Sequence, residues 1–318
     1  MKSLITGRFR AGLLCATFAV LSAATVKADP FAYLASGDSS FGVINLQTGL
    51  YTPLGETSLG DSEKTLYGMG VANGLLFATT YETDAGALFT VDPTNGHLTF
   101  VGNANGDNPS NPASAETPAI DFWAFGSTNS GLYGIDAASK NLYSVNPNNG
   151  AATLIGNTGL TGFADWSQFS VGSDSLYFAN GNSLYSINTS TGAATLVGDT
   201  GGPHIGAMVY ENGVLYGGQN PAYAQCDGPC GAPCGQNCGD GGPSAADPIP
   251  GLNVVILSTE TGTATIQAAV SGLAADDAFF ALAPAAALAT PEPSTGLLAG
   301  ISAAALLFAL RRMRGQQI

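Results

Sequence analysis

Residues 184–198 of this chain read LYSINTSTGAATLVG, and the same phrase returns twice with small changes. Residues 142–156 read LYSVNPNNGAATLIG, and residues 88–102 read LFTVDPTNGHLTFVG. In each copy, apolar and polar residues alternate on both sides of a polar turn that ends in glycine. A period of two predicts half-buried β-strands, and the turn predicts an antiparallel hairpin with glycine at positive φ.

Turns of the same kind predict five repeats along the chain. The turn glycines lie 42 to 70 residues apart and are Gly49, Gly96, Gly150, Gly192 and Gly262. Each repeat also contains a strand with Leu-Tyr, Leu-Phe or a similar pair, and a leading apolar strand such as residues 121–125. Four strands at this period are typical of a propeller blade. A β-sandwich or a solenoid is the alternative fold.

The two ends of the repeat region suggest how such a ring closes. No leading strand precedes Phe31, whereas an unmatched apolar strand at residues 278–282 follows the fifth repeat. Pairing these ends leaves no open sheet edge. We therefore expect an all-β, five-bladed β-propeller over residues 29–283, with its first blade completed from the C-terminus. The repeats resemble those of YVTN-type bacterial surface propellers, a likeness of architecture only.

The charge of this region limits the classes of partner. Between Asp29 and Thr290 there are 22 acidic residues, two lysines (Lys64 and Lys140) and no arginine, a net charge near −20. Such a surface repels phosphate backbones, so nucleic-acid binding is excluded. An acidic surface of this kind favours solubility, and it is compatible with the binding of cations or of neutral glycans.

The N-terminal residues 1–28 predict a signal peptide. Basic residues near the start (Lys2, Arg8, Arg10) precede an apolar run at 11–21, which is shorter than the roughly 20 residues that a bilayer-spanning helix requires. Small residues near the end predict cleavage by signal peptidase after Ala28, with Ala24 as the second choice.

The C-terminal residues 291–314, after a linker at 284–290, combine three elements in fixed order. Pro291-Glu292-Pro293 comes first, an uncharged apolar run at 297–310 follows, and the basic cluster is Arg311, Arg312 and Arg314. The apolar run predicts a single membrane helix of about 21 Å, whose arginines snorkel to the interface. The basic cluster should remain on the cytoplasmic side, which places the main domain outside the membrane.

This order resembles the PEP-CTERM sorting signal of bacterial surface proteins. The resemblance implies that an exosortase recognises the Pro-Glu-Pro motif and that the helix is a temporary anchor. It also implies a location at the cell envelope surface or outside the cell, commonly in association with exopolysaccharide. A permanent single-span anchor is the alternative.

A Gly/Pro-rich insertion at residues 219–250 lengthens the fifth repeat. It contains four cysteines, Cys226, Cys230, Cys234 and Cys238. In an exported protein an even number of cysteines predicts disulfides, here two with three possible pairings. A zinc or iron–sulfur site is the alternative, although the usual two-residue spacers are missing.

Acidic residues directly precede several leading strands. In a propeller the innermost strands line the central channel, so Asp121, Asp165 and Asp277 would converge at one mouth, with His204 before a further leading strand. Their oxygen ligands predict a Ca²⁺ site, and capping of turns is the alternative role. The chain lacks a Gly-x-Ser-x-Gly nucleophile motif.

Together these features predict a non-catalytic surface or extracellular module that binds exopolysaccharide or envelope proteins. A hydrolase or lyase that uses a cation in the channel is one alternative. A structural matrix component is another.

Overall fold

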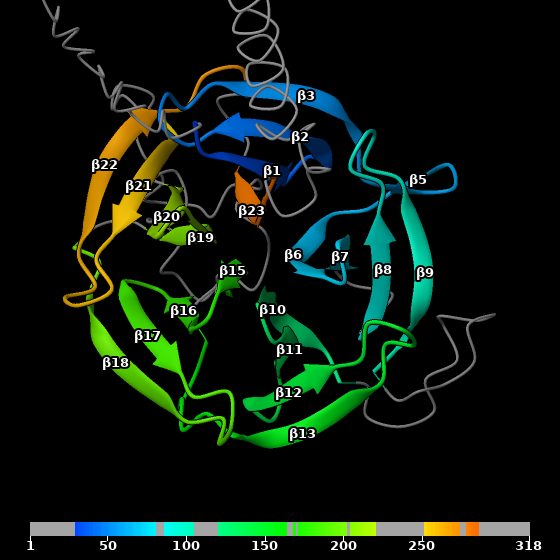
Figure 1. Ribbon diagram of the computed structural model, residues 1–318, viewed down its shortest axis with the longest axis vertical. Helices are drawn as coiled ribbons and strands as arrows, with labels where there is room; N and C mark the ends of the chain where they lie inside the picture. Colours follow the sequence, from blue (N-terminus) through cyan, green and yellow to red (C-terminus); the bar gives the residue numbers. More distant parts are fainter. Residues whose placement is uncertain are drawn as a thin grey trace, which may run out of the picture.

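The computed structural model describes residues 29–80, 86–104, 120–163, 168–169, 171–201, 204–220, 251–273 and 278–285. Within these residues every regular element is a β-strand. Figure 1 shows that the strands form five blades arranged radially around a central axis. The predicted five-bladed β-propeller is therefore confirmed.

Each blade is an antiparallel sheet whose four main strands follow one another from the axis outward. Blade 1 consists of β23 (Phe279–Pro284), β1 (Phe31–Ser36), β2 (Ser40–Asn45) and β3 (Tyr51–Glu56). Blade 2 consists of β6 (Leu66–Ala72), β7 (Leu75–Thr80), β8 (Ala87–Val91) and β9 (Leu98–Asn103). Blade 3 consists of β10 (Phe122–Thr128), β11 (Gly131–Asp136), β12 (Asn141–Val145) and β13 (Ala152–Asn157).

The other two blades follow the same order. Blade 4 consists of β14 (Gln168–Phe169), β16 (Leu176–Asn180), β17 (Ser183–Ile187) and β18 (Ala194–Asp199). Blade 5 consists of β19 (Ile205–Glu211), β20 (Val214–Gln219), β21 (Asn253–Leu257) and β22 (Ala264–Ala269). The short β15 (Val171–Ser173) pairs in parallel with β10, and β4 (Ser58–Leu59) forms a hairpin with β5 (Ser62–Glu63).

The ring closes as the sequence predicts. The C-terminal strand β23 is the innermost strand of blade 1 and pairs antiparallel with β1, with Ala32 opposite Pro284. Beyond this pair, the Ala285 backbone nitrogen donates to the Phe31 carbonyl oxygen at 3.1 Å. Both ends of the described chain therefore leave the propeller side by side.

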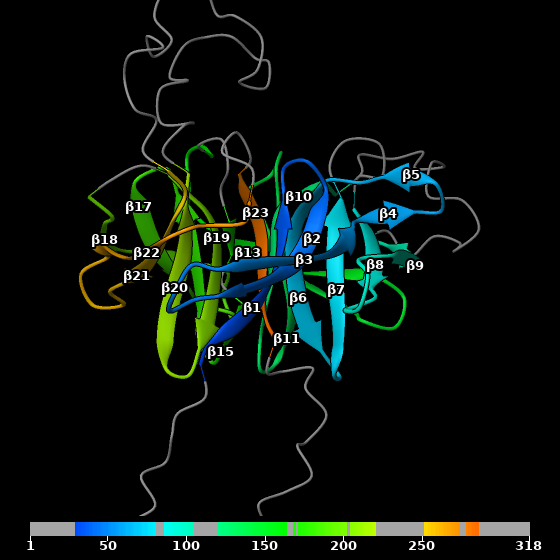
Figure 2. The same cartoon turned by 90° about the horizontal axis from the view of Figure 1, so that it is seen from above.

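The propeller has two faces of different construction (Figure 2). The inner strands begin on the face that we call the loop face, which carries the connections between blades, such as residues 57–65 with β4 and β5. They end on the turn face, which carries the tight inner turns Asn73–Gly74, Asn129–Ser130 and Asn212–Gly213. The start of β1 and the end of β23 also lie on the turn face.

The glycines of the repeated phrase join neighbouring blades. Gly150, in the outer turn of blade 3, has a φ of 74° and lies against Gly102 of blade 2, where a β-carbon would be 2.7 Å from the Gly102 carbonyl carbon. Two residues beyond Gly150, the Ala152 backbone nitrogen donates to the Ala104 carbonyl oxygen at 2.9 Å. The same bond recurs between Ala194 and Thr158. The phrase therefore encodes the blade junction as well as the hairpin.

The hydrophobic core is divided among the spaces between blades. Phe41 of blade 1 packs with Phe89 of blade 2, and Leu142 of blade 3 packs with Phe178 of blade 4. The leucines of the Leu-Tyr pairs, such as Leu176, are fully buried, each worth about 1.5–3 kcal/mol of hydrophobic stabilisation. The leucines of these pairs are thus core residues, and the partly buried Tyr143, Tyr177 and Tyr185 pack against the same clusters.

Several predicted segments lie outside the described residues. These are the signal peptide at 1–28, residues 221–250 of the insertion, and the chain from residue 286 onward. Among the described residues no helix is long and apolar enough to cross a bilayer. The proposed domain boundaries, the disulfides and the membrane helix therefore stay predictions.

Candidate functional site

The inner strands are irregular where they begin, at the loop-face mouth of the channel. The register of β6 against β7 shifts between Leu66 and Gly68, and that of β10 against β11 shifts between Phe122 and Ala124. Each shift leaves one extra residue in the inner strand, Tyr67 in blade 2 and Trp123 in blade 3. A bulge of this kind redirects the side chain of the extra residue.

Tyr67 and Trp123 lie next to each other at this mouth. Their ring centroids are 6.4 Å apart, and Trp123 stacks on Phe163 with centroids 6.0 Å apart and an interplanar angle of 26°. All three rings are partly exposed, and neither Tyr67 nor Trp123 belongs to the buried clusters that the described residues form. We call Tyr67, Trp123 and Phe163 the aromatic row.

The outer end of the row is fixed to blades 3 and 4. Phe163 makes an edge-to-face contact with the buried Phe178, at 5.6 Å between centroids. The Lys140 ammonium lies 4.5 Å from the centroid of the Phe163 ring and donates to the Ala137 carbonyl oxygen. This cation–π contact and the core contact hold Phe163 in place.

Asp121 lies close to the aromatic row, one residue before β10. Burial raises the pKa of its carboxyl group, and the negative charge of Asp136 raises that pKa further. The Asp136 carboxylate itself accepts hydrogen bonds from the backbone nitrogens of Asp121, at 3.0 Å, and Ser139, at 2.8 Å. Asp136 therefore stabilises the local backbone through its hydrogen bonds, and its charge adds to the rise in the pKa of Asp121.

Only some residues of the predicted calcium site belong to the part of the chain that the structure describes. Asp121 directly precedes β10 at the loop-face mouth, and His204 directly precedes β19 at the same face. Asp165 and Asp277 lie outside the described residues. Among the described residues, no three His, Cys, Asp or Glu side chains gather as they would around a metal ion. The calcium site stays a prediction.

The predicted processing and disulfide residues also lie outside the described chain. They are Cys226, Cys230, Cys234, Cys238, Pro291, Glu292, Pro293, Arg311, Arg312 and Arg314. The predicted start of the insertion at residue 219 is too early, because Gln219 is the last residue of β20 and pairs with Asn253. The described chain stops at Asn220 and resumes at Gly251, and both of these ends are on the loop face.

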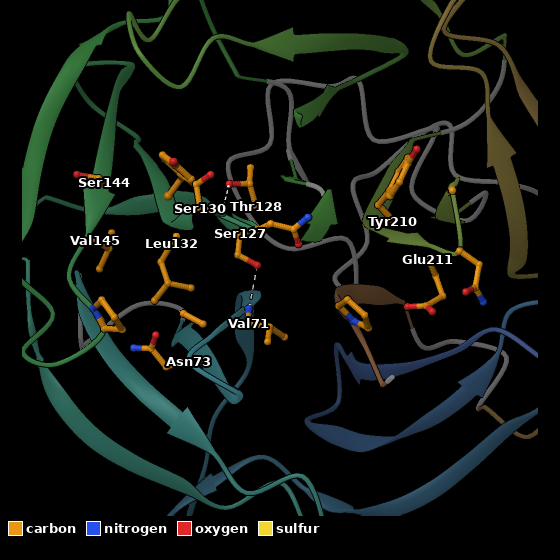
Figure 3. Close-up of a pocket in the computed structure, with 18 residues that line it drawn as sticks. Val71, Asn73, Ser127, Thr128, Ser130, Leu132, Ser144, Val145, Tyr210 and Glu211 are labelled. Atoms are coloured by element: carbon orange, nitrogen blue, oxygen red, sulfur yellow. Dashed lines mark hydrogen bonds between the residues drawn. The ribbon is translucent and has the colours of Figure 1, made fainter. Parts of the chain in front are cut away.

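The turn-face mouth of the channel holds a cavity of about 660 Å³ (Figure 3). Its walls come from the ends of β6, β10 and β19, and they include Asn73, Thr128, Tyr210 and Glu211. The Ser127 hydroxyl accepts a hydrogen bond from the Val71 backbone nitrogen at 2.9 Å and so ties β10 to β6. Glu211 is buried, with 7% of its surface exposed. The lining of this mouth therefore mixes polar and apolar residues, and its described aromatic residues are two tyrosines, Tyr133 and Tyr210, from blades 3 and 5.

Sequence reasoning missed most of the aromatic row. It placed Trp123 in a leading strand and Asp121 at the mouth, but it did not single out Tyr67, Phe163 or Lys140. The usable signal is an aromatic residue at the second position of two leading strands, Leu66-Tyr67 and Phe122-Trp123. Tyr67 and Trp123 occupy equivalent positions in neighbouring repeats, and this equivalence could have predicted that the two rings lie next to each other.

Comparison with known families concerns the C-terminus, where residues 289–314 match the model of the PEP-CTERM protein-sorting motif. The chain carries this sorting motif. The motif indicates an exported, exosortase-processed and membrane-associated cell-surface protein. Curated proteins give no match to this chain. The likeness of the repeats to YVTN-type propellers stays a prediction, whereas the propeller fold itself is confirmed.

Proposed function

We propose that this chain is a non-catalytic binding module of the cell envelope, which binds a neutral polysaccharide on the aromatic row. The alternative ligand class from the sequence, an envelope protein, is an outcome of the test. The observation that carries the proposal is the contiguous, partly exposed series of Tyr67, Trp123 and Phe163 at one mouth of the channel.

The chemistry of these rings suits a sugar. A pyranose presents an apolar C–H face and a polar rim of hydroxyl groups. An aromatic ring that is fixed in place covers such a face at little cost in conformational entropy, and its edges leave the hydroxyls in water. Because Phe163 stacks on Trp123 and also carries the Lys140 ammonium, it would mainly hold Trp123 in position. Tyr67 and Trp123, with centroids 6.4 Å apart, would contact neighbouring sugar units, which favours a polysaccharide over a single sugar.

The charge of the domain selects among polysaccharides. With 22 acidic residues against two lysines between Asp29 and Thr290, the surface repels polyanions over roughly a Debye length, about 8 Å at physiological salt. A neutral glycan meets no such barrier. An acidic glycan would bind only where divalent cations bridge the two negative charges.

The direct test uses the full-length chain, purified in detergent without a reducing agent, and the exopolysaccharide of the cell that exports it. Binding is measured by calorimetry with calcium and with a chelator, beside dextran as a neutral glycan and polygalacturonate as an acidic one. We expect saturable binding of the neutral glycan in both conditions. Binding of envelope proteins without binding of any glycan would reject the proposal and support the protein-ligand alternative.

A second candidate is a hydrolase or lyase that acts on the same glycan. It is favoured by one observation, the pKa of Asp121, two residues before Trp123, which burial and Asp136 raise, because the general acid in glycoside cleavage is commonly a carboxyl group with a raised pKa. Such an enzyme would release new reducing ends from the bound glycan, and Asp121→Asn would abolish their release. A chain that binds the glycan and leaves it intact would exclude this activity.

A further inference from the structure

We propose that the turn face lies toward the membrane while the sorting segment holds the chain, so that the loop face points away from the membrane. The aromatic row would then be presented outward. This orientation rests on the sorting motif and on the path of the chain through the propeller. The orientation does not depend on glycan binding, so the two proposals can fail separately.

The path of the chain places the attachment point on the turn face. β23 is the last strand of the propeller, and its end, Pro284, lines the cavity at the turn-face mouth. The Ala285 backbone nitrogen donates a hydrogen bond to the Phe31 carbonyl oxygen, and this bond fixes the exit of the chain at the turn face. The chain that leads to the sorting motif therefore departs from the turn face near the propeller axis.

The spacer between propeller and motif is short. The matched motif begins at residue 289, and the Ala285 backbone nitrogen is hydrogen-bonded to Phe31 at the start of β1. At no more than 3.3–3.6 Å per residue, the four steps from Ala285 to residue 289 span at most about 14 Å. The turn face is thus held close to the segment that exosortase processes.

The opposite orientation requires the chain to pass the full height of the propeller. β10 has seven residues and runs from one face toward the other, a rise of about 23 Å at 3.3 Å per residue. The chain would also have to travel from the axis to the rim of the ring before it could pass this height. Twelve steps lead from Ala285 to the apolar run that begins at Leu297, which is at most about 43 Å of fully extended chain, so this path would use most of that length. The orientation with the turn face toward the membrane needs no such extension and is therefore favoured.

The turn face carries no lysine or arginine among the described residues, because Lys64 and Lys140 both lie on the loop face. Electrostatic attachment to acidic lipid headgroups needs clustered Lys or Arg. The turn face is therefore held near the membrane by the tether and does not bind lipid by its own charge.

Energy transfer to the membrane tests the orientation. The full-length chain is reconstituted in phosphatidylcholine vesicles with acceptor-labelled headgroups, with a donor dye on an unnatural amino acid at one of two exposed turn positions. Ser130 lies in the inner turn of blade 3 on the turn face, and Asp61 lies in the β4–β5 hairpin on the loop face. Because both sites are exposed turns, the dye disturbs packing similarly little.

We expect several-fold more efficient transfer from position 130 than from position 61, and none from either in detergent without acceptor lipid. Equal transfer would show that the propeller tumbles freely on its tether, and stronger transfer from position 61 would show the reverse orientation. Either result overturns the inference. Dextran binding, measured on the same vesicles, reports separately on the proposed function.

Discussion

Gly156, at the end of blade 3, and Gly192, in the outer turn of blade 4, are in direct backbone contact. A β-carbon on Gly192 would lie 2.6 Å from the Gly156 carbonyl oxygen, and Gly192 has a φ of 84°. The corresponding contacts join Gly198 to Gly262 and Gly102 to Gly150. These blades therefore meet at positions where a side chain has no room.

Gly192→Ala should lower the free energy of unfolding more than its backbone strain alone explains. A left-handed conformation costs a non-glycine residue about 1–2 kcal/mol, and the clash with Gly156 adds to this cost. Gly213→Ala is the matched control, because Gly213 has a φ of 85° and open space around its β-carbon position. Urea unfolding should show the larger loss for Gly192→Ala. Equal losses would mean that the blade contact adjusts freely.

Asn220→Ala should weaken closure of the ring. The buried Asn220 side chain donates to the Phe279 carbonyl oxygen and accepts from the Phe279 backbone nitrogen, both at 3.0 Å, and so fixes the first residue of β23. Removing it leaves two buried backbone groups unpaired, at about 1–3 kcal/mol each. Asn253→Ala, at a partly exposed position of the same blade, is the control for thermal unfolding. A loss no greater than that of the control would contradict this role.

Asp121→Asn should change how stability depends on pH. Because the pKa of Asp121 is raised in the folded state, first by burial and then by Asp136, the folded chain binds the proton more tightly than the unfolded chain. Stability therefore falls as pH rises between the ordinary aspartate pKa and the raised one. The variant should be more stable than the wild type at neutral pH and equal to it at acid pH.

The measurement is urea unfolding at several pH values, with Asp61→Asn as an exposed control. A difference between Asp121→Asn and the wild type that stays constant across this pH range would rule out the raised pKa as its cause.

The sequence predicted the propeller because its determinants are local and repeated. The hairpin phrase at residues 184–198 contains the strand alternation, the turn and the junction glycines, and the unpaired strand at 278–282 revealed the closure. Each of these features can be read within a short window of sequence.

The aromatic row could not be predicted in the same way, because its parts come from different blades. Tyr67 and Trp123 are brought together by the packing of β6 beside β10, and each leaves the regular strand pattern through a bulge that depends on the partner strand. Phe163 comes from the connection between blades 3 and 4, outside the repeated hairpin phrase. Asp121 was found because it stands at a fixed place before its strand.

Glycan binding by Trp123→Ala and Tyr210→Ala variants of the full-length chain tests the central claim most directly. Both residues are partly exposed aromatics of the inner strands, but Trp123 lies at the loop-face mouth and Tyr210 lies at the turn-face mouth. Loss of one stacked ring, on the order of 1.5–3 kcal/mol, corresponds to about a tenfold or greater rise in Kd. We predict this rise for Trp123→Ala and an unchanged Kd for Tyr210→Ala, with both variants folded by circular dichroism. Unchanged binding by Trp123→Ala would contradict glycan binding on the aromatic row.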